Sequence, residues 1–221
     1  MHRIKNRSTL MQIIREVAVT DYQHLVTLEK EHTQRIAIGT NFENGGLTPS
    51  RGFMAEAKKY LADQPVSLST IIRPHLQDHT YNDAEIKIME ADIFDAQQLG
   101  LDGIIIDALT DDAQQLDFEA LENLIAAAGG MMVTFGTAFD LLPQAKQQAA
   151  LDWLIEHNVD RVLVHGSADA TQSVLANVDW LLELIKHAKQ QIDIIPANVL
   201  PNEVDEVLTK LSIKQVHVAT H

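Results

Sequence analysis

Five polar side chains could do chemistry in this 221-residue chain, because each lies in or just after a short apolar run. They are Glu16, Arg73, Asp140, His165 and His217. Carboxylates and imidazoles can transfer protons or bind metal ions, and a guanidinium can hold an anion through two parallel hydrogen bonds. These residue types are those of a metal site, or of an enzyme that acts on a small anionic metabolite.

The two histidines are the predicted metal ligands. Two imidazoles and one carboxylate suit Zn²⁺ or Cu²⁺ if they converge, so we predict His165 and His217 as ligands, with Asp140 as the carboxylate. Ordinary hydrogen bonding is the alternative, and it is the commoner role of a single histidine at a strand end. The chain has no cysteine, so copper(I) lacks its preferred thiolate, and any copper would be Cu²⁺ on nitrogen and oxygen.

Glu16, Arg73 and Asp140 are the predicted catalytic residues. Arg73 could clamp an anionic substrate, or it could pair with Glu16 and hold the structure together. Asp140 could act as a general base or metal ligand, but an aspartate before "LLP" can also cap the next helix, which is the favoured interpretation. Both pairs of alternatives stay open at the level of sequence.

A glycine pair is the predicted backbone contribution to a ligand site. Gly45 and Gly46 can bring backbone amides close to a ligand, and Ser50 follows them. They could equally form only a turn ahead of a helix that Ser50 caps. A sugar-phosphate substrate is disfavoured, because Ala197, Asn198 and Val199 replace the glycines expected of a phosphate loop after a seventh strand.

Charge and composition exclude several classes of partner. The chain has 17 Lys and Arg against 31 Asp and Glu, a formal charge of -14, so neither nucleic acid nor anionic lipid is an expected partner. No apolar run reaches the roughly 18 residues of a membrane span. We expect a cytoplasmic protein whose ligand is a small molecule or a metal ion, and the sequence leaves a homodimer open.

The elements that must position these residues alternate between two types. Eight short runs rich in β-branched residues predict strands at 13–19, 35–39, 66–74, 102–109, 131–135, 161–166, 192–196 and 216–220. The segments between them carry helical stripes and caps, such as Asn82 with Glu85, and Asp117. Eight such units predict a single α/β domain, a (β/α)8 TIM-like barrel at 11–221, whose active face is the carboxyl end of the strands.

The chain ends are predicted to be atypical for a barrel. Residues 1–10 are polar and basic, so we expect a flexible tail there. The eighth predicted strand is followed directly by the last residue, so the last helix is expected to be missing or truncated.

Several motifs resemble the CutC family, named for copper homeostasis. They match in order and spacing over roughly residues 12–217: "GGLTPS" at 45–50, "IIRP" at 71–74, "YNDAEI" at 81–86, "VTF" with "AFD" within 133–140, and "RVLVHGS" at 161–167. The resemblance implies a single TIM-like barrel, a cytoplasmic location and a role in copper binding or handling. No reaction is firmly attached to the family.

Departures from the family pattern lie in the predicted pocket. Relatives usually carry a histidine after the strand-five phenylalanine, where this chain has Gly136. The second strand, the segment after "IRP" and the turn after the seventh strand also differ. A relative with a degenerate site is therefore a third hypothesis, beside the copper protein and the barrel enzyme.

Overall fold

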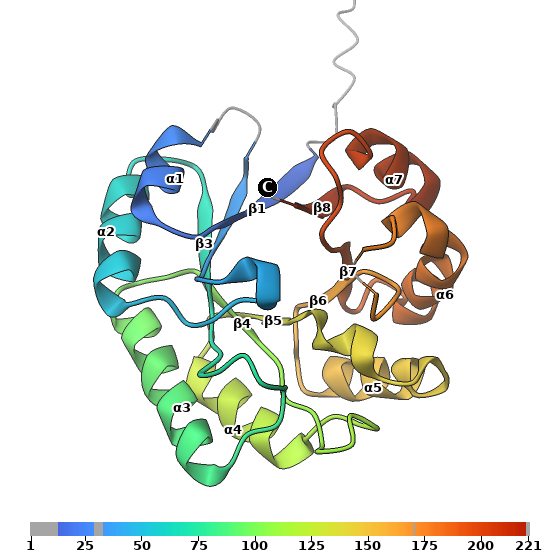
Figure 1. Cartoon of the computed structure of the whole chain (residues 1–221), viewed down its shortest axis with the longest axis horizontal. Helices are drawn as coiled ribbons and strands as arrows, with labels where there is room; N and C mark the ends of the chain where they lie inside the picture. The colour runs from blue at the N-terminus through green and yellow to red at the C-terminus, as the bar shows by residue number, and fades with distance from the viewer. Residues whose placement is uncertain (1–12, 29–32, 170, 220–221) are drawn as a thin grey trace, which may run out of the picture.

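The architecture is a barrel of parallel strands inside a ring of helices (Figure 1). The computed structural model describes residues 13–28, 33–169 and 171–219, so the predicted tail at 1–10 lies outside the described residues. The strands are β1 (Ile14–Val19), β2 (Arg35–Ile38), β3 (Ser67–Ile71), β4 (Gly103–Ile106), β5 (Met132–Phe135), β6 (Arg161–Val164), β7 (Asp193–Pro196) and β8 (Gln215–Val218). The predicted TIM-like fold is confirmed.

The helices that cover the strands are α1 (Tyr22–Thr27), α2 (Arg51–Leu61), α3 (Asp83–Gln98), α4 (Phe118–Ala128), α5 (Gln144–Glu156), α6 (Val178–Ala188) and α7 (Val204–Leu211). Three short 3-10 segments, η2 (Phe42–Asn44), η3 (Thr137–Leu141) and η4 (Val174–Asn177), lie in the loops that follow β2, β5 and β6. Asn82 and Glu85 form the predicted capping box of α3, and Asp117 caps α4.

Neighbouring strands pair in parallel in the order β7-β6-β5-β4-β3-β2-β1-β8. The β1–β8 pairing brings the first and last strands together, and it places Glu16 opposite His217. Because all strands are parallel, their carboxyl ends meet on one face, and this face is the mouth of the barrel.

The seam between β7 and β8 closes the barrel with little backbone pairing. Among the described residues it consists of one parallel bridge, in which the Val199 N–H donates to His217 O at 3.1 Å and the Ala219 N–H donates to Val199 O at 2.9 Å. Near the opposite end, the Gln215 side chain donates to Asp193 Oδ2 at 2.7 Å. The barrel is therefore nearly closed, with its weakest backbone pairing at this seam.

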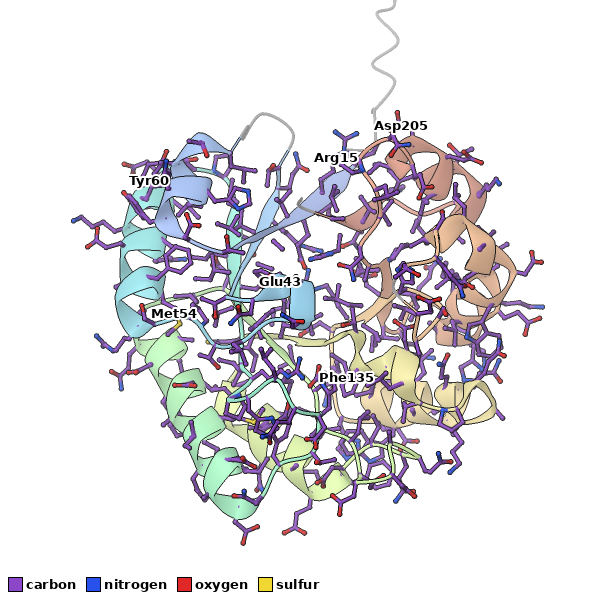
Figure 2. The ribbon with its side chains drawn as sticks, viewed as in Figure 1. Arg15, Glu43, Met54, Tyr60, Phe135 and Asp205 are labelled. Atoms are coloured by element: carbon purple, nitrogen blue, oxygen red, sulfur yellow. The ribbon has the colours of Figure 1, made fainter. Side chains whose placement is uncertain are left out.

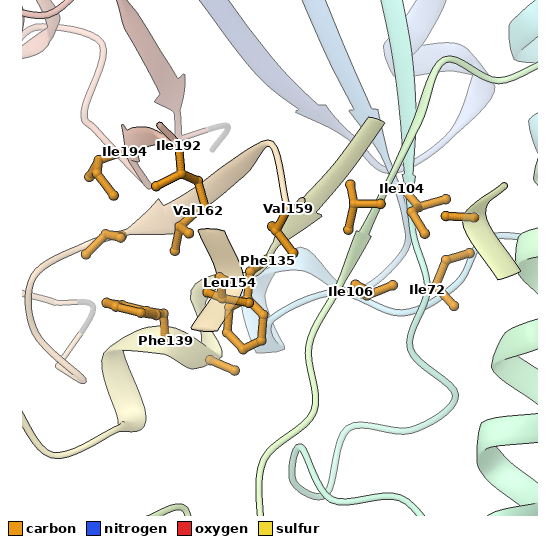
Figure 3. Packing of buried hydrophobic residues seen from close by; sticks show 14 of the residues in the cluster. Ile72, Ile104, Ile106, Phe135, Phe139, Leu154, Val159, Val162, Ile192 and Ile194 are labelled. Carbon is orange, nitrogen blue, oxygen red and sulfur yellow. The ribbon is translucent and has the colours of Figure 1, made fainter. Parts of the chain in front are cut away.

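The apolar residues form two clusters. The larger one lies between the sheet and the surrounding helices, where residues such as Phe135, Phe139, Leu154 and Val162 pack together (Figure 3). The smaller one fills the barrel interior with Ala37, Ile71, Ile105, Leu163, Ile195 and Ala197, and Phe42 of η2 packs against it. This inner layer forms the apolar floor beneath the mouth.

No eighth helix follows β8 in the part of the chain that the structure describes. A salt bridge between Arg15 of β1 and Asp205 of α7 lies on this side of the barrel, with a distance of 3.6 Å from Arg15 Nη2 to Asp205 Oδ1 (Figure 2). The predicted absence of a full last helix agrees with these residues. No helix among the described residues is long and apolar enough to cross a membrane.

Candidate functional site

The mouth of the barrel holds a small cavity of about 50 Å³. Strand ends and loops from seven of the eight strands, β2 to β8, line it. Its polar lining comes from Arg73, Asp107, Thr137, Asn198 and His217, and its apolar lining from Phe42, Ile71, Ile72, Ile105 and Leu163, together with Gly45 and Gly136. Of the predicted site residues, Arg73, His217 and Gly45 thus line one cavity.

Arg73 is buried at the mouth without a carboxylate partner. Its side chain is 4 % exposed, and it donates from Nη1 to Asn44 O at 3.3 Å and from Nη2 to Asp78 O at 3.2 Å. Nε has no hydrogen-bond partner among the described residues, and no described carboxylate lies within salt-bridge distance. The predicted pairing with Glu16 is therefore wrong, and the alternative of an anion clamp stays open.

Glu16 instead pairs with Arg161, deeper in the barrel. The distance from Arg161 Nη1 to Glu16 Oε2 is 2.6 Å, and both side chains are fully buried. Arg161 Nε and Nη2 and Glu16 Oε1 have no partners among the described residues. Glu16 is not among the residues that line the mouth cavity.

His217 lies between the ion pair and the cavity. It is opposite Glu16 in the β1–β8 register and lines the mouth cavity. Its Nδ1 accepts a hydrogen bond of 3.3 Å from the Asn198 N–H. Burial lowers the pKa of His217, an effect that Glu16 opposes and Arg161 strengthens. Because the Nδ1 lone pair accepts this hydrogen bond, it is not free for a metal.

Asp107 is not among the predicted catalytic or metal-binding residues, yet it lines the cavity at the end of β4. Its Oδ1 accepts from Tyr81 Oη at 3.2 Å and lies 2.7 Å from His79 Nδ1, whereas Oδ2 has no hydrogen-bond partner among the described residues. Burial and the nearby Asp107 carboxylate raise the pKa of Tyr81. In the sequence, only the position of Asp107 late in a predicted strand indicates that it lies at the mouth of the barrel.

Gly136 makes room for this carboxylate. A Cβ atom at Gly136 would lie 2.7 Å from Asp107 Oδ2, which is closer than non-bonded atoms approach. A histidine at this position would therefore require the Asp107 carboxylate to shift from its present position. The two residues form a matched pair at the mouth.

Asp140 and His165 are engaged in structural hydrogen bonds outside the mouth cavity. Asp140 accepts from the backbone N–H groups of His165 at 2.7 Å and Gly166 at 2.8 Å, so the predicted cap of the next helix is wrong. Burial raises the pKa of Asp140 to about 6, against the opposing effect of these two hydrogen bonds. Asp140 therefore supports the β6 loop.

His165 does not join His217 as a metal ligand. Its Nδ1 lies 3.0 Å from Ala197 O and its Nε2 lies 2.9 Å from Gln172 O, so both ring nitrogens meet backbone carbonyls. A nitrogen that donates to a carbonyl has no lone pair for a metal. Among the described residues, no three His, Asp or Glu side chains are grouped closely enough to hold a metal ion.

The predicted glycine segment forms a turn and a cap. Gly45 and Gly46 have φ angles of 93° and 87°, which favour glycine, and Ser50 caps α2 by accepting from the Phe53 N–H at 3.2 Å. A Cβ atom at Gly45 would lie 2.6 Å from Arg73 Nη1. Gly45 therefore lets the guanidinium pack against the loop.

The family model described as the CutC family matches residues 13–221. A CutC protein of Enterococcus faecalis is 39% identical over 206 residues, covering 93% of this chain and 98% of that protein. A CutC protein of Streptococcus pyogenes is 37% identical over 200 residues, covering 90% and 95%. The chain belongs to the CutC family.

The solved structures agree with this assignment. A crystal structure described as a copper homeostasis protein CutC from Streptococcus agalactiae superimposes with a TM-score of 0.89 at 31% identity, covering 93% of this chain and 98% of that one. A phosphonopyruvate hydrolase at 16% identity, with a TM-score of 0.64, shares the fold alone.

Proposed function

We propose that this chain is a copper-homeostasis protein, the role that the description of its Streptococcus agalactiae relative names, and that it works in the cytoplasm. The relationship supports this role, because it extends over residues 13–221 and includes the whole barrel. The comparisons do not favour the alternative of an enzyme for an anionic metabolite. Catalytic roles for Glu16, Arg73 and Asp140 and a homodimer stay predictions, and a degenerate site stays a hypothesis.

Divalent copper is the metal ion that suits this chain. The protein handles it as a substrate and not as a resident cofactor. The chain has no cysteine, so its donors are imidazole nitrogens and carboxylate oxygens, which suit Cu²⁺ better than Cu⁺. Neither histidine predicted as a ligand has a free ring lone pair. A metal contact at the mouth therefore falls to another imidazole.

His79 is the proposed copper ligand, and one observation carries this assignment. Its Nδ1 lies 2.7 Å from Asp107 Oδ1, and Asp107 lines the mouth cavity. Histidines that bind metals usually donate their other ring N–H to a carboxylate, which fixes the tautomer and leaves a lone pair on the opposite nitrogen. Asp107 would hold His79 in this state, so that Nε2 takes the ion.

The affinity of such a site would be modest. No third donor is grouped with His79 and Asp107 among the described residues, so water would complete the coordination. Arg73 lies in the same cavity as Asp107 and opposes the binding of a cation. We therefore expect exchangeable copper rather than a permanently held ion.

Titration of Cu²⁺ into the full chain, followed by isothermal calorimetry and electron paramagnetic resonance, tests this proposal. We expect His79→Ala to weaken binding by about tenfold or more, and Asp107→Asn to weaken it less. His187→Ala is the matched control, because His187 Nε2 also lies 2.7 Å from a carboxylate, Asp152, on the outer surface. Equal effects of the two alanine variants, or no copper binding by the wild type, would contradict the proposal.

A further inference from the structure

Arg73 and Asp107 line the same mouth cavity, yet they form no ion pair with each other. We propose that this cavity binds the head group of a small organic acid, namely a carboxylate with a hydroxyl or ammonium group on the neighbouring carbon. This inference goes beyond copper homeostasis, and it holds with or without a metal ion.

Arg73 supplies the recognition of the carboxylate. A guanidinium has five N–H donors, and only two nitrogens of Arg73 meet acceptors, both of which are neutral backbone carbonyls. Nε is buried and has no partner among the described residues. A buried cation without a counter-ion is unfavourable, so an anionic group that enters the cavity would offset this cost and accept hydrogen bonds.

Asp107 recognises the hydroxyl or ammonium group next to the carboxylate of the ligand. Oδ1 is occupied by His79 and Tyr81, whereas Oδ2 is free beside Gly136. An ionised carboxylate only accepts hydrogen bonds, so the ligand must bring a hydroxyl or ammonium group to Oδ2. The same negative charge repels a second negative charge on the ligand, so Asp107 disfavours phosphate and dicarboxylates.

The size and floor of the cavity set the length of the ligand. The cavity of about 50 Å³ is small, so it fits a short ligand. Ile71, Ile105 and Leu163 make the floor apolar, so it fits the CH or CH₂ group between the two polar ends. Glycolate is a short molecule with this pattern of groups.

The test uses the metal-free full chain, with chelator present, and measures binding by calorimetry and thermal shift. We expect glycolate to bind at least about tenfold more tightly than acetate, which lacks the hydroxyl group, and phosphate not to bind. We expect Arg73→Met to abolish glycolate binding. Arg51→Met is the matched control and should leave binding unchanged, because Arg51 is exposed and pairs with Asp95 on the outer helices. Because no metal is present, failure here leaves the copper proposal standing.

Two further variants keep the test decisive. Asp107→Asn should lower the preference for glycolate over acetate, because the amide no longer supplies a charged acceptor. If Arg73→Met does not fold, Arg73→Lys retains the charge but loses the planar fork, and it should weaken glycolate binding about tenfold while the circular dichroism spectrum stays native. Equal binding of glycolate and acetate, or glycolate binding that a folded Arg73 variant retains, would overturn the proposal.

Discussion

Two arginines are buried in the barrel, and they have opposite surroundings. Arg161 lies in the middle of the barrel and meets the Glu16 carboxylate at 2.6 Å. Arg73 lies at the mouth and meets only backbone carbonyls. Glu16 neutralises the charge of Arg161 within the fold, whereas the charge of Arg73 remains available for a ligand that enters from solvent. The comparison separates a structural ion pair from a candidate binding group of the same residue type.

The largest expected effect comes from breaking the inner ion pair. Arg161→Met should lower the free energy of unfolding by about 3–5 kcal/mol, because it leaves Glu16 buried without a partner. Arg73→Met should cost less than about 1.5 kcal/mol, because it removes only two hydrogen bonds to carbonyls. Denaturant unfolding measures both losses. The double variant Glu16→Gln with Arg161→Met should recover part of the stability that Arg161→Met loses. Equal losses for Arg161→Met and Arg73→Met would contradict the difference between the two arginines.

An intermediate effect is expected from filling the space beside Asp107. Gly136→His should destabilise the chain by about 1–3 kcal/mol, because the new Cβ would overlap with Asp107 Oδ2. Adding Asp107→Ala should restore most of this stability, because the conflict then disappears. Thermal unfolding of the two single variants and the double variant measures the coupling. Additive losses would mean that the two positions are not a matched pair.

The smallest effect should come from His217, which lies between the two regions. Its pKa is lowered in the folded state, so the unfolded chain takes up a proton at a higher pH, and stability falls as the pH drops below the ordinary value of about 6.5. The slope is at most about 1.4 kcal/mol per pH unit. His217→Gln should flatten the fall between pH 6.5 and 5, as seen in chemical unfolding at each pH. An unchanged slope would show that other groups carry the pH dependence.

The fold could be predicted because its signals are local. Each strand is a run of β-branched residues, and caps such as Asn82 with Glu85 mark the helix starts within a few positions. Eight alternating units then limit the topology to very few choices. The third predicted strand, 66–74, was too long, because β3 ends at Ile71 and the chain then turns into the loop that carries Arg73.

The site was only partly predictable because its contacts join distant segments. The sequence left open a pairing of Glu16 with Arg73, but Glu16 meets Arg161, which is 145 residues away. Asp140 was expected to cap the helix beside it, yet its partners are N–H groups 25 and 26 residues ahead. His79 lies on a loop, where nothing local in the sequence fixes its distance from Asp107.

The β7–β8 seam has a consequence for how quickly molecules can enter the barrel. It depends on a single backbone bridge at Val199, next to Asn198 and His217 in the cavity wall. Backbone pairs of this kind open locally at lower free energy than a continuous strand ladder does. The amide hydrogens of Val199 and Ala219 should exchange with solvent before those shared by β1 and β8. Local opening of this seam would briefly widen the mouth, so the rate of ligand entry would follow the opening of the barrel wall.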